Sequence, residues 1–70
     1  MNTIKFKKGD LVERIADYHQ GMDIGDQGIV TFGGYLTVDL ILTKTNKESN
    51  GHSPSKLKLV KTKLETYEIY

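Results

Sequence analysis

Two histidines and a group of loop aspartates are the residues whose types could support metal binding or acid–base chemistry. His19 and His52 are the only histidines, and the chain contains no cysteine. A zinc site needs more ligands than these, and Asp17, Asp23 and Asp26 lack the alternating ligands and final glutamate of an EF-hand loop. We therefore predict no metal site and no cofactor. The aspartates are expected to form turns, and His52 to pack or hydrogen-bond within the fold.

Catalysis by a serine nucleophile is the other chemistry that these residue types allow. Serine, histidine and aspartate all occur in the sequence, but a triad is recognised by geometry and not by composition. The sequence contains no nucleophile elbow, no phosphate-binding loop and no dinucleotide fingerprint. A chain of 70 residues forms one small domain, which rarely encloses a substrate. We predict that the chain has no catalytic residues and is not an enzyme.

Charge is distributed unevenly along the chain, although the net charge is only +1. Between Gly9 and Leu42 the charged residues are mainly acidic, whereas both ends of the chain are basic. Such asymmetry can mark a nucleic-acid-binding face, and a solvated surface of mixed charge gives the same pattern. The lysines that we assign to a nucleic-acid-binding face are Lys5, Lys7, Lys8, Lys58, Lys61 and Lys63.

Aromatic and imidazole side chains in the predicted loops form a second candidate site. Tyr18 and His19 lie in a long polar loop, and Tyr35 follows a Gly33-Gly34 hairpin turn. Exposed rings at these positions could stack on bases or receive a peptide, or one or two of them could cover the open end of the fold. We assign Tyr18, His19 and Tyr35 to partner binding.

The elements that must position these residues are predicted to be β-strands. Residues 36–42 alternate apolar and polar side chains, which is the period of a half-buried strand. Residues 27–32 are rich in β-branched and aromatic side chains, which indicates a second strand. Two further short strands are predicted at residues 11–15 and 57–61. Polar loops rich in turn-forming residues are predicted at residues 16–26 and 43–51.

Turn residues indicate how these strands are connected. Gly33-Gly34 is expected to supply the positive φ angles of a tight hairpin, and Asn50-Gly51 to form a second turn. Pro54 suits the first position of a helical turn, and the Ser53 hydroxyl is expected to cap that turn.

Two segments resemble the KOW motif, in which a strand opens with Gly-Asp and a loop leads to a Gly-x-Val strand. These segments are Lys8-Gly9-Asp10-Leu11-Val12 and Ile24-Gly25-Asp26-Gln27-Gly28-Ile29-Val30. The chain is also similar to small SH3-fold proteins of bacteriophages and prophages, through residues 21–30 and through His52-Ser53-Pro54-Ser55-Lys56-Leu57. The resemblance covers about residues 8 to 61.

The resemblance implies an all-β fold: a small five-stranded SH3-like barrel over residues 1–61, with a short helical turn before the last barrel strand. Residues 62–70 would form a C-terminal tail. The first and last strands of such a barrel are adjacent, so the two basic ends of the chain would meet. KOW domains bind RNA, ribosomal protein or RNA polymerase, and related SH3-like barrels bind peptides. The acidic loop at residues 16–26 departs from typical KOW domains, because its carboxylates would repel a phosphate backbone.

The strand pattern predicts which side chains are buried. Met22 and Ile24 are expected to fold back from their loop onto the core, which consists of Phe6, Val12, Val30, Phe32, Leu36, Val38, Leu40, Leu57 and Leu59. The tail is too apolar to leave in water, so we predict that it packs on the barrel or on a second copy in a homodimer. The sequence shows no secretory signal and no apolar run of membrane-spanning length, and we expect a cytoplasmic protein.

We therefore expect a non-catalytic binding module whose partner is a nucleic acid or a nucleoprotein complex, bound through the lysines without reading of bases. The alternative is a protein-binding module that uses the acidic, aromatic loop, such as a phage-encoded modulator of a host protein. A third hypothesis is a structural or dimerising protein whose tail joins a neighbouring copy.

Overall fold

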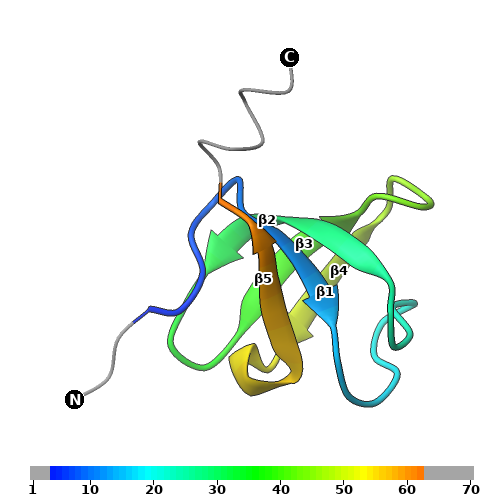
Figure 1. The fold of residues 1–70 in the computed structure, drawn as a ribbon, viewed down its shortest axis with the longest axis horizontal. Coiled ribbons are helices and arrows are strands. Elements are labelled where there is room, and N and C mark those ends of the chain that lie inside the picture. The colour runs from blue at the N-terminus through cyan, green and yellow to red at the C-terminus, as the bar shows by residue number, and fades with distance from the viewer. Residues whose placement is uncertain (1–3, 63–70) are drawn as a thin grey trace.

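The computed structural model describes residues 4–62, which form one antiparallel sheet (Figure 1). A single turn of 3-10 helix, Pro54–Lys56, precedes the last strand. The strands follow the order β4-β3-β2-β1-β5 in the sheet, and they are β1 (Leu11–Arg14), β2 (Gln27–Gly33), β3 (Val38–Leu42), β4 (Glu48–His52) and β5 (Leu57–Lys61). The predicted all-β fold with five strands and a helical turn before the last strand is confirmed. No helix in this part of the chain is long and apolar enough to cross a membrane.

The core is built from side chains that alternate along the central strands. β3 buries Val38, Leu40 and Leu42 and turns the residues between them away, which is the predicted period of two. Leu40 lies opposite Val30 of β2, so the two side chains share the inner face. The other buried hydrophobic side chains are Phe6, Val12, Met22 and Leu57. All of these residues except Leu42 belong to the predicted core.

β4 is a strand that the sequence pattern does not predict. Four of its five residues, 48–51, fall in the predicted polar loop, because Asn50-Gly51 favours a turn and the segment has no run of β-branched side chains. In the structure β4 pairs with β3, with His52 opposite Val38. The Ser49 hydroxyl also donates a hydrogen bond to the Gln20 carbonyl over 2.8 Å. Tertiary contacts, and not local propensity, therefore determine this strand.

Phe32 was predicted to lie in the core, and this is wrong: its side chain is 56% exposed. The cause is a β-bulge, because the pairing of β2 with β3 shifts between Val30 and Phe32. Val30 lies opposite Leu40 on the inner face, whereas Phe32 lies opposite Asp39 on the outer face. A single extra residue in a strand reverses the facing of the side chains that follow it.

Three further side chains that were predicted to be buried are exposed. Leu36 precedes β3, which begins at Val38, so Leu36 belongs to the turn and not to the strand. Leu59 pairs with Val12 and lies on the same face of the sheet. Its side chain is nevertheless half-exposed, because β5 is the last strand in the sheet order and has a neighbouring strand on one side only. Ile24 points away from the core, although Met22 from the same loop is fully buried.

The turn between β2 and β3 does not use positive φ angles at Gly33 and Gly34, contrary to the prediction. Gly33 is needed for a different reason. A Cβ at this position would lie 1.9 Å from the Phe6 carbonyl oxygen, where no side chain fits. The N-terminal segment therefore passes directly over Gly33 and brings residues 4–7 beside the β2–β3 turn.

The helical turn before β5 begins at Pro54, as predicted. The predicted cap is wrong, because the Ser53 side chain makes no capping hydrogen bond. Its hydroxyl lies 3.1 Å from the Ser55 hydroxyl instead.

Candidate binding surfaces

Exposed hydrophobic side chains gather where the N-terminal segment crosses the β2–β3 turn. Ile4, Phe32, Tyr35 and Leu36 are each about half or more exposed, with Leu36 reaching 84%. All four line one open hollow of about 400 Å³. Ile4 reaches this hollow because the N-terminal segment crosses Gly33. Phe32 is turned outward by the β-bulge in β2. Leu36 lies in the turn because β3 begins only at Val38. We call these four residues the hairpin surface.

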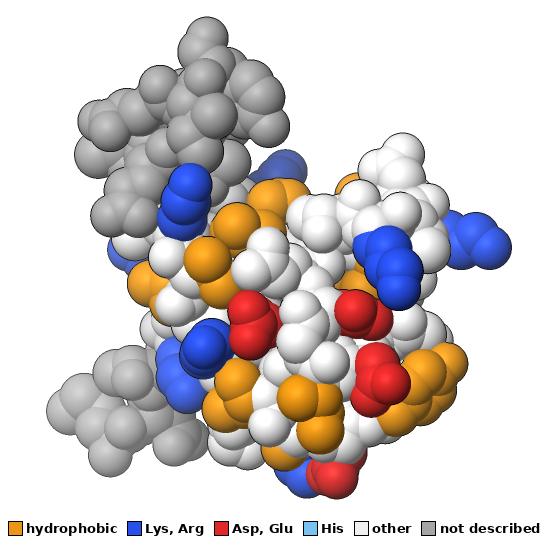
Figure 2. Space-filling view, turned by 45° about the vertical axis from the view of Figure 1, so that its right-hand side comes forward, with side chains coloured by type: hydrophobic (Ala, Val, Ile, Leu, Met, Phe, Trp, Pro, Cys, Tyr) orange, Lys and Arg blue, Asp and Glu red, His pale blue; other side chains and the backbone are white. Residues whose placement is uncertain are grey.

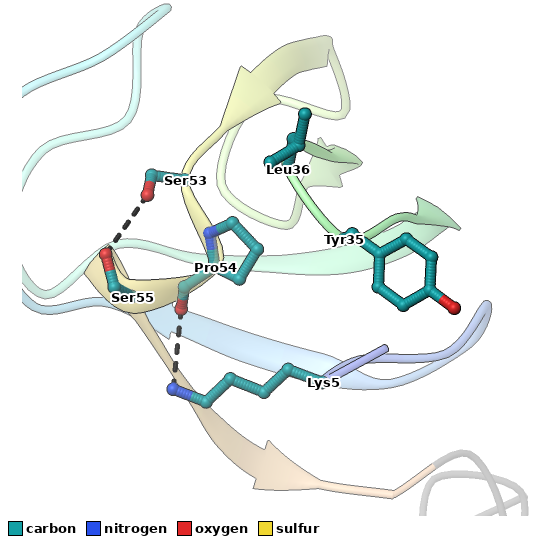
Figure 3. Close-up of a pocket in the computed structure, with 6 residues that line it drawn as sticks. All are labelled: Lys5, Tyr35, Leu36, Ser53, Pro54 and Ser55. Atoms are coloured by element: carbon teal, nitrogen blue, oxygen red, sulfur yellow. Dashed lines mark hydrogen bonds between the residues drawn. The ribbon is translucent and has the colours of Figure 1, made fainter. Parts of the chain in front are cut away.

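A second hollow, of about 450 Å³, adjoins the hairpin surface (Figure 3). It lies between Tyr35 and Leu36 on one side and the turn Ser53–Ser55 on the other, with Lys5 at its edge. The Lys5 ammonium donates a long hydrogen bond of 3.5 Å to the Pro54 carbonyl. Because Tyr35 and Leu36 line both hollows, the two form one continuous surface with an apolar centre.

The charges around this surface are mainly positive. Neither hollow is lined by a carboxylate of the described residues, whereas the segment before β1 supplies the exposed Lys5, Lys7 and Lys8. The Lys7 backbone nitrogen lies 3.5 Å from the position of a Cβ on Gly33, so Lys7 flanks the turn. Asp39, opposite Phe32, accepts a hydrogen bond from the Gly51 N–H over 3.0 Å. The apolar centre therefore has a basic margin on its N-terminal side.

The lysines that were predicted to form one nucleic-acid-binding face are distributed over more than one place. Lys61 lies opposite Leu11, so it sits at the end of the sheet where the turn at Lys8 leads into β1. Lys5 instead lies beside Pro54, next to the start of β5. Lys8 and Lys61 thus share one end of the sheet, whereas Lys5 lies at the edge of the second hollow, beside the hairpin surface.

Two ion pairs within residues 4–62 reduce the basic character of β5 and the turn before it. The Lys58 ammonium lies 3.7 Å from a Glu13 carboxylate oxygen, and Lys56 pairs with Asp17. The hydrogen bond from Lys56, together with its charge, lowers the pKa of Asp17 below 3.8. Lys58 is thus partly neutralised within the fold, and Lys63 lies outside the described residues.

The carboxylates of Asp23 and Asp26 serve turns in the loop between β1 and β2, whereas the Asp17 carboxylate of the same loop pairs with Lys56. An Asp26 oxygen accepts the Asp23 N–H over 3.0 Å, and an Asp23 oxygen accepts the Ile24 N–H over 2.8 Å. These contacts agree with the predicted turn-forming role. Figure 2 shows carboxylates in the middle of the face that it presents, with basic side chains around them and in several places directly beside them, so this side of the molecule carries mixed charge.

A buried polar cluster ties the same loop to β4. Arg14, Ser49 and His52 are almost completely buried. Arg14 Nη1 lies 3.0 Å from His52 Nδ1, and Ser49 Oγ lies 2.6 Å from His52 Nε2. Because the single Ser49 hydroxyl proton goes to the Gln20 carbonyl, His52 Nε2–H must donate to Ser49 while Nδ1 accepts from Arg14. The hydrogen bonds thus specify a neutral His52 protonated at Nε2, and its predicted packing and bonding role is confirmed.

The contact between Ser49 and His52 is not arranged as a nucleophile and its base. The hydroxyl proton points to Gln20, and both side chains are fully buried. The group behind the imidazole is the Arg14 guanidinium, whereas a triad needs a carboxylate there to stabilise an imidazolium. Burial first, and then the Arg14 charge, lower the pKa of His52 from 6.5 to about 4. The cluster therefore serves to hold β1, β4 and the loop together.

Of the three predicted partner-binding residues, only Tyr35 reaches the hairpin surface. His19 Nε2 donates to the Asn50 carbonyl over 3.0 Å, and its ring meets the His52 ring edge-on at a centroid distance of 4.8 Å. His19 is thus committed to the contact between the loop and β4. Tyr18, on the same loop, is exposed. Three of the four residues of the hairpin surface were not assigned to a site from the sequence.

No protein-family model, curated protein or solved structure matches this chain.

Proposed function

We propose that this protein is a non-catalytic binding module that holds a segment of a partner protein on the hairpin surface. The observation that supports this most is the gathering of Ile4, Phe32, Tyr35 and Leu36 around one open hollow. Removal of apolar area from water is favourable by about 25 cal/mol per Å², before the entropic and desolvation costs of association are subtracted. Contiguous exposed apolar patches and aromatic side chains are typical of the central part of protein interfaces.

The shape of the surface favours a macromolecule over a small ligand. Both hollows are open to solvent and share Tyr35 and Leu36. Small-molecule sites usually bury most of the surface of their ligand in a closed cleft. The buried Ser49 and His52 pair is also unsuited to act on a bound substrate, which supports binding without catalysis.

Replacing both Tyr35 and Leu36 with serine is expected to lower the capture of the partner at least tenfold. Both side chains are exposed, so the fold should be retained, whereas loss of two central apolar contacts typically costs an interface more than about 1.4 kcal/mol, which is tenfold in affinity. The measurement is affinity capture with the tagged full chain from a nuclease-treated lysate of cells that express it. The bound proteins are then quantified by mass spectrometry.

The matched control replaces Tyr18 and Ile24 with serine. This pair also consists of one exposed aromatic and one exposed aliphatic side chain, but on the loop between β1 and β2. The control variant should capture the partner as the wild type does. Loss of the partner in the control, with retention in the hairpin variant, would contradict the proposal and favour the acidic, aromatic loop.

A second candidate function is sequence-independent nucleic-acid binding, which the placement of Lys8 and Lys61 at one end of the sheet favours. Lys7, in the same turn as Lys8, adds a third positive charge, and of the three lysines Lys61 is only partly exposed. Lysine contacts phosphates as a point charge and reads no bases. The net charge of +1 and the acidic loop make a larger phosphate-binding area unfavourable.

If these three lysines each neutralise a phosphate, the logarithm of affinity should fall with the logarithm of salt concentration at a slope of roughly −3. Replacing Lys7 and Lys8 with glutamine should then reduce the slope to roughly −1. Replacing Lys44 and Lys47, which are exposed between β3 and β4, should leave the slope unchanged. Fluorescence anisotropy with labelled RNA and DNA checks this, and absence of binding to either at about 50 mM salt would reject this second function.

A further inference from the structure

We infer that the partner segment held by the hairpin surface is acidic as well as apolar. The inference rests on the proposed function and adds the chemistry of the ligand. Two observations carry it: the apolar centre formed by Ile4, Phe32, Tyr35 and Leu36, and the basic margin formed by the exposed Lys5, which lines the second hollow, and Lys7, which flanks Gly33.

The margin lysines keep hydrogen-bonding capacity for a ligand. A lysine ammonium has three donors, and the Lys5 ammonium makes one long bond of 3.5 Å to the Pro54 carbonyl. The ion pairs within residues 4–62 take Lys56 and Lys58, not the lysines of the margin. A segment with carboxylates beside its apolar side chains would pair with Lys5 while its apolar side chains fill the hollows.

The surface offers little to a basic segment. Among the described residues no carboxylate lines either hollow, and Asp39, which lies opposite Phe32, is absent from both linings. Basic groups on the ligand would therefore meet like charges, which raises the cost of the complex. Acidic groups would instead be steered towards the surface over a distance of about one Debye length.

A protein segment suits this surface better than a single-stranded nucleic acid. Nucleic-acid strands bind by stacking of bases on aromatic faces, but Ile4 and Leu36 are aliphatic, and Leu36 is the most exposed large hydrophobic side chain of the surface. Arg14 is the only arginine of the chain, and it is buried in the core, away from solvent. Arginine stacking on bases is therefore not available at the hairpin surface.

The test uses two synthetic peptides that differ only in charge. One has the sequence Gly-Glu-Leu-Glu-Tyr-Glu-Leu-Glu-Gly, and its twin has glutamine at every glutamate. Each is titrated into the isotopically labelled full chain while backbone amide shifts are recorded. The acidic peptide should shift amides of residues 4–7, 33–37 and 53–55 and bind about fivefold more tightly than its twin at about 50 mM salt. At about 500 mM salt the difference should largely disappear.

Replacing Lys5 and Lys7 with glutamine should make the chain bind the two peptides equally. The control variant, with Lys44 and Lys47 replaced by glutamine, should keep the preference for the acidic peptide, because these exposed lysines lie between β3 and β4. Amide spectra of both variants without peptide establish that the fold is retained.

The outcomes separate this inference from the proposed function. Equal binding of the twins to the wild-type chain, or binding of neither, would overturn the inference, whereas the proposed function is judged separately by the capture experiment with the hairpin variant. Larger shifts of the same amides with oligothymidine than with the acidic peptide would assign the surface to a nucleic acid and overturn the inference. Shifts of these amides that depend on protein concentration, without any ligand, would assign the hairpin surface to a second copy of the chain. That result would also overturn the inference.

Discussion

Val38→Asp should abolish the cooperative unfolding transition of this domain. The Val38 side chain is fully buried in β3, between Gly33 of β2 and His52 of β4. Burying an unpaired carboxylate costs several kcal/mol, or forces the group to take up a proton. A domain of this size has a total stability of roughly 4–10 kcal/mol, so most or all of it would be lost. Thermal melting followed by circular dichroism measures the effect.

The matched control for this prediction is Thr37→Asp. Thr37 is the preceding residue and its side chain is exposed, so the new carboxylate stays in water. The control should melt within a few degrees of the wild type. A cooperative melt of Val38→Asp close to that of the control would contradict the assignment of the core.

The unfolding free energy of the wild type should fall by about 3 kcal/mol as the pH is lowered from 6.5 to 4. His52 causes this decrease in stability, because burial and the Arg14 guanidinium lower its folded-state pKa from 6.5 to about 4. Well above pH 6.5 the imidazole is neutral in both the folded and the unfolded state, and the stability is fully present. Between pH 6.5 and 4 only the unfolded state takes up the proton, so stability declines over this window.

Asp17 titrates outside that window. Its pKa is lowered from 3.8 by Lys56, so its contribution is present above pH 3.8 and is lost only at more acidic pH. The loss of stability between pH 6.5 and 4 can therefore be attributed to His52 and not to the ion pair between Asp17 and Lys56.

The control for the pH prediction is His52→Gln, whose amide can donate to Ser49 and accept from Arg14. This variant should be less stable than the wild type at pH 7 but should lose most of the pH dependence. His19→Gln should largely keep the pH dependence. Urea unfolding at several pH values measures all three proteins, and a flat wild-type profile between pH 6.5 and 4 would show that His52 is not held neutral as described.

The sequence predicted the class of the fold because its strongest signals are local. The alternation from Val38 to Leu42, the loop glycines and Pro54 all act within a few residues of themselves. β4 was missed because its residues have weak strand propensity, and it forms through pairing with β3 and through the bond from Ser49 to Gln20. Long-range contacts of this kind leave no local pattern.

The hairpin surface could be predicted only in part for a related reason. Tyr35 follows two glycines and was assigned to partner binding, as its exposure allows. Phe32 continues the alternation of Val30, so the pattern places it inside, and the bulge that turns it outward depends on the register with β3. Ile4 reaches the surface only because the chain crosses over Gly33. The resemblance to KOW and other SH3-like barrels remains a prediction. So does the packing of the tail at residues 62–70, of which residues 63–70 lie outside the described part of the chain.

The most direct test of protein binding through the hairpin surface is a map of backbone amide shifts in the labelled chain with its captured partner. We predict that the changes concentrate in residues 4–6 and 32–37, with weaker changes at 53–55, and that they are lost in the variant with serine at Tyr35 and Leu36. Changes confined to the loop at 16–26, or to residues 8–9 and 58–61, with residues 32–37 unaffected, would contradict the account.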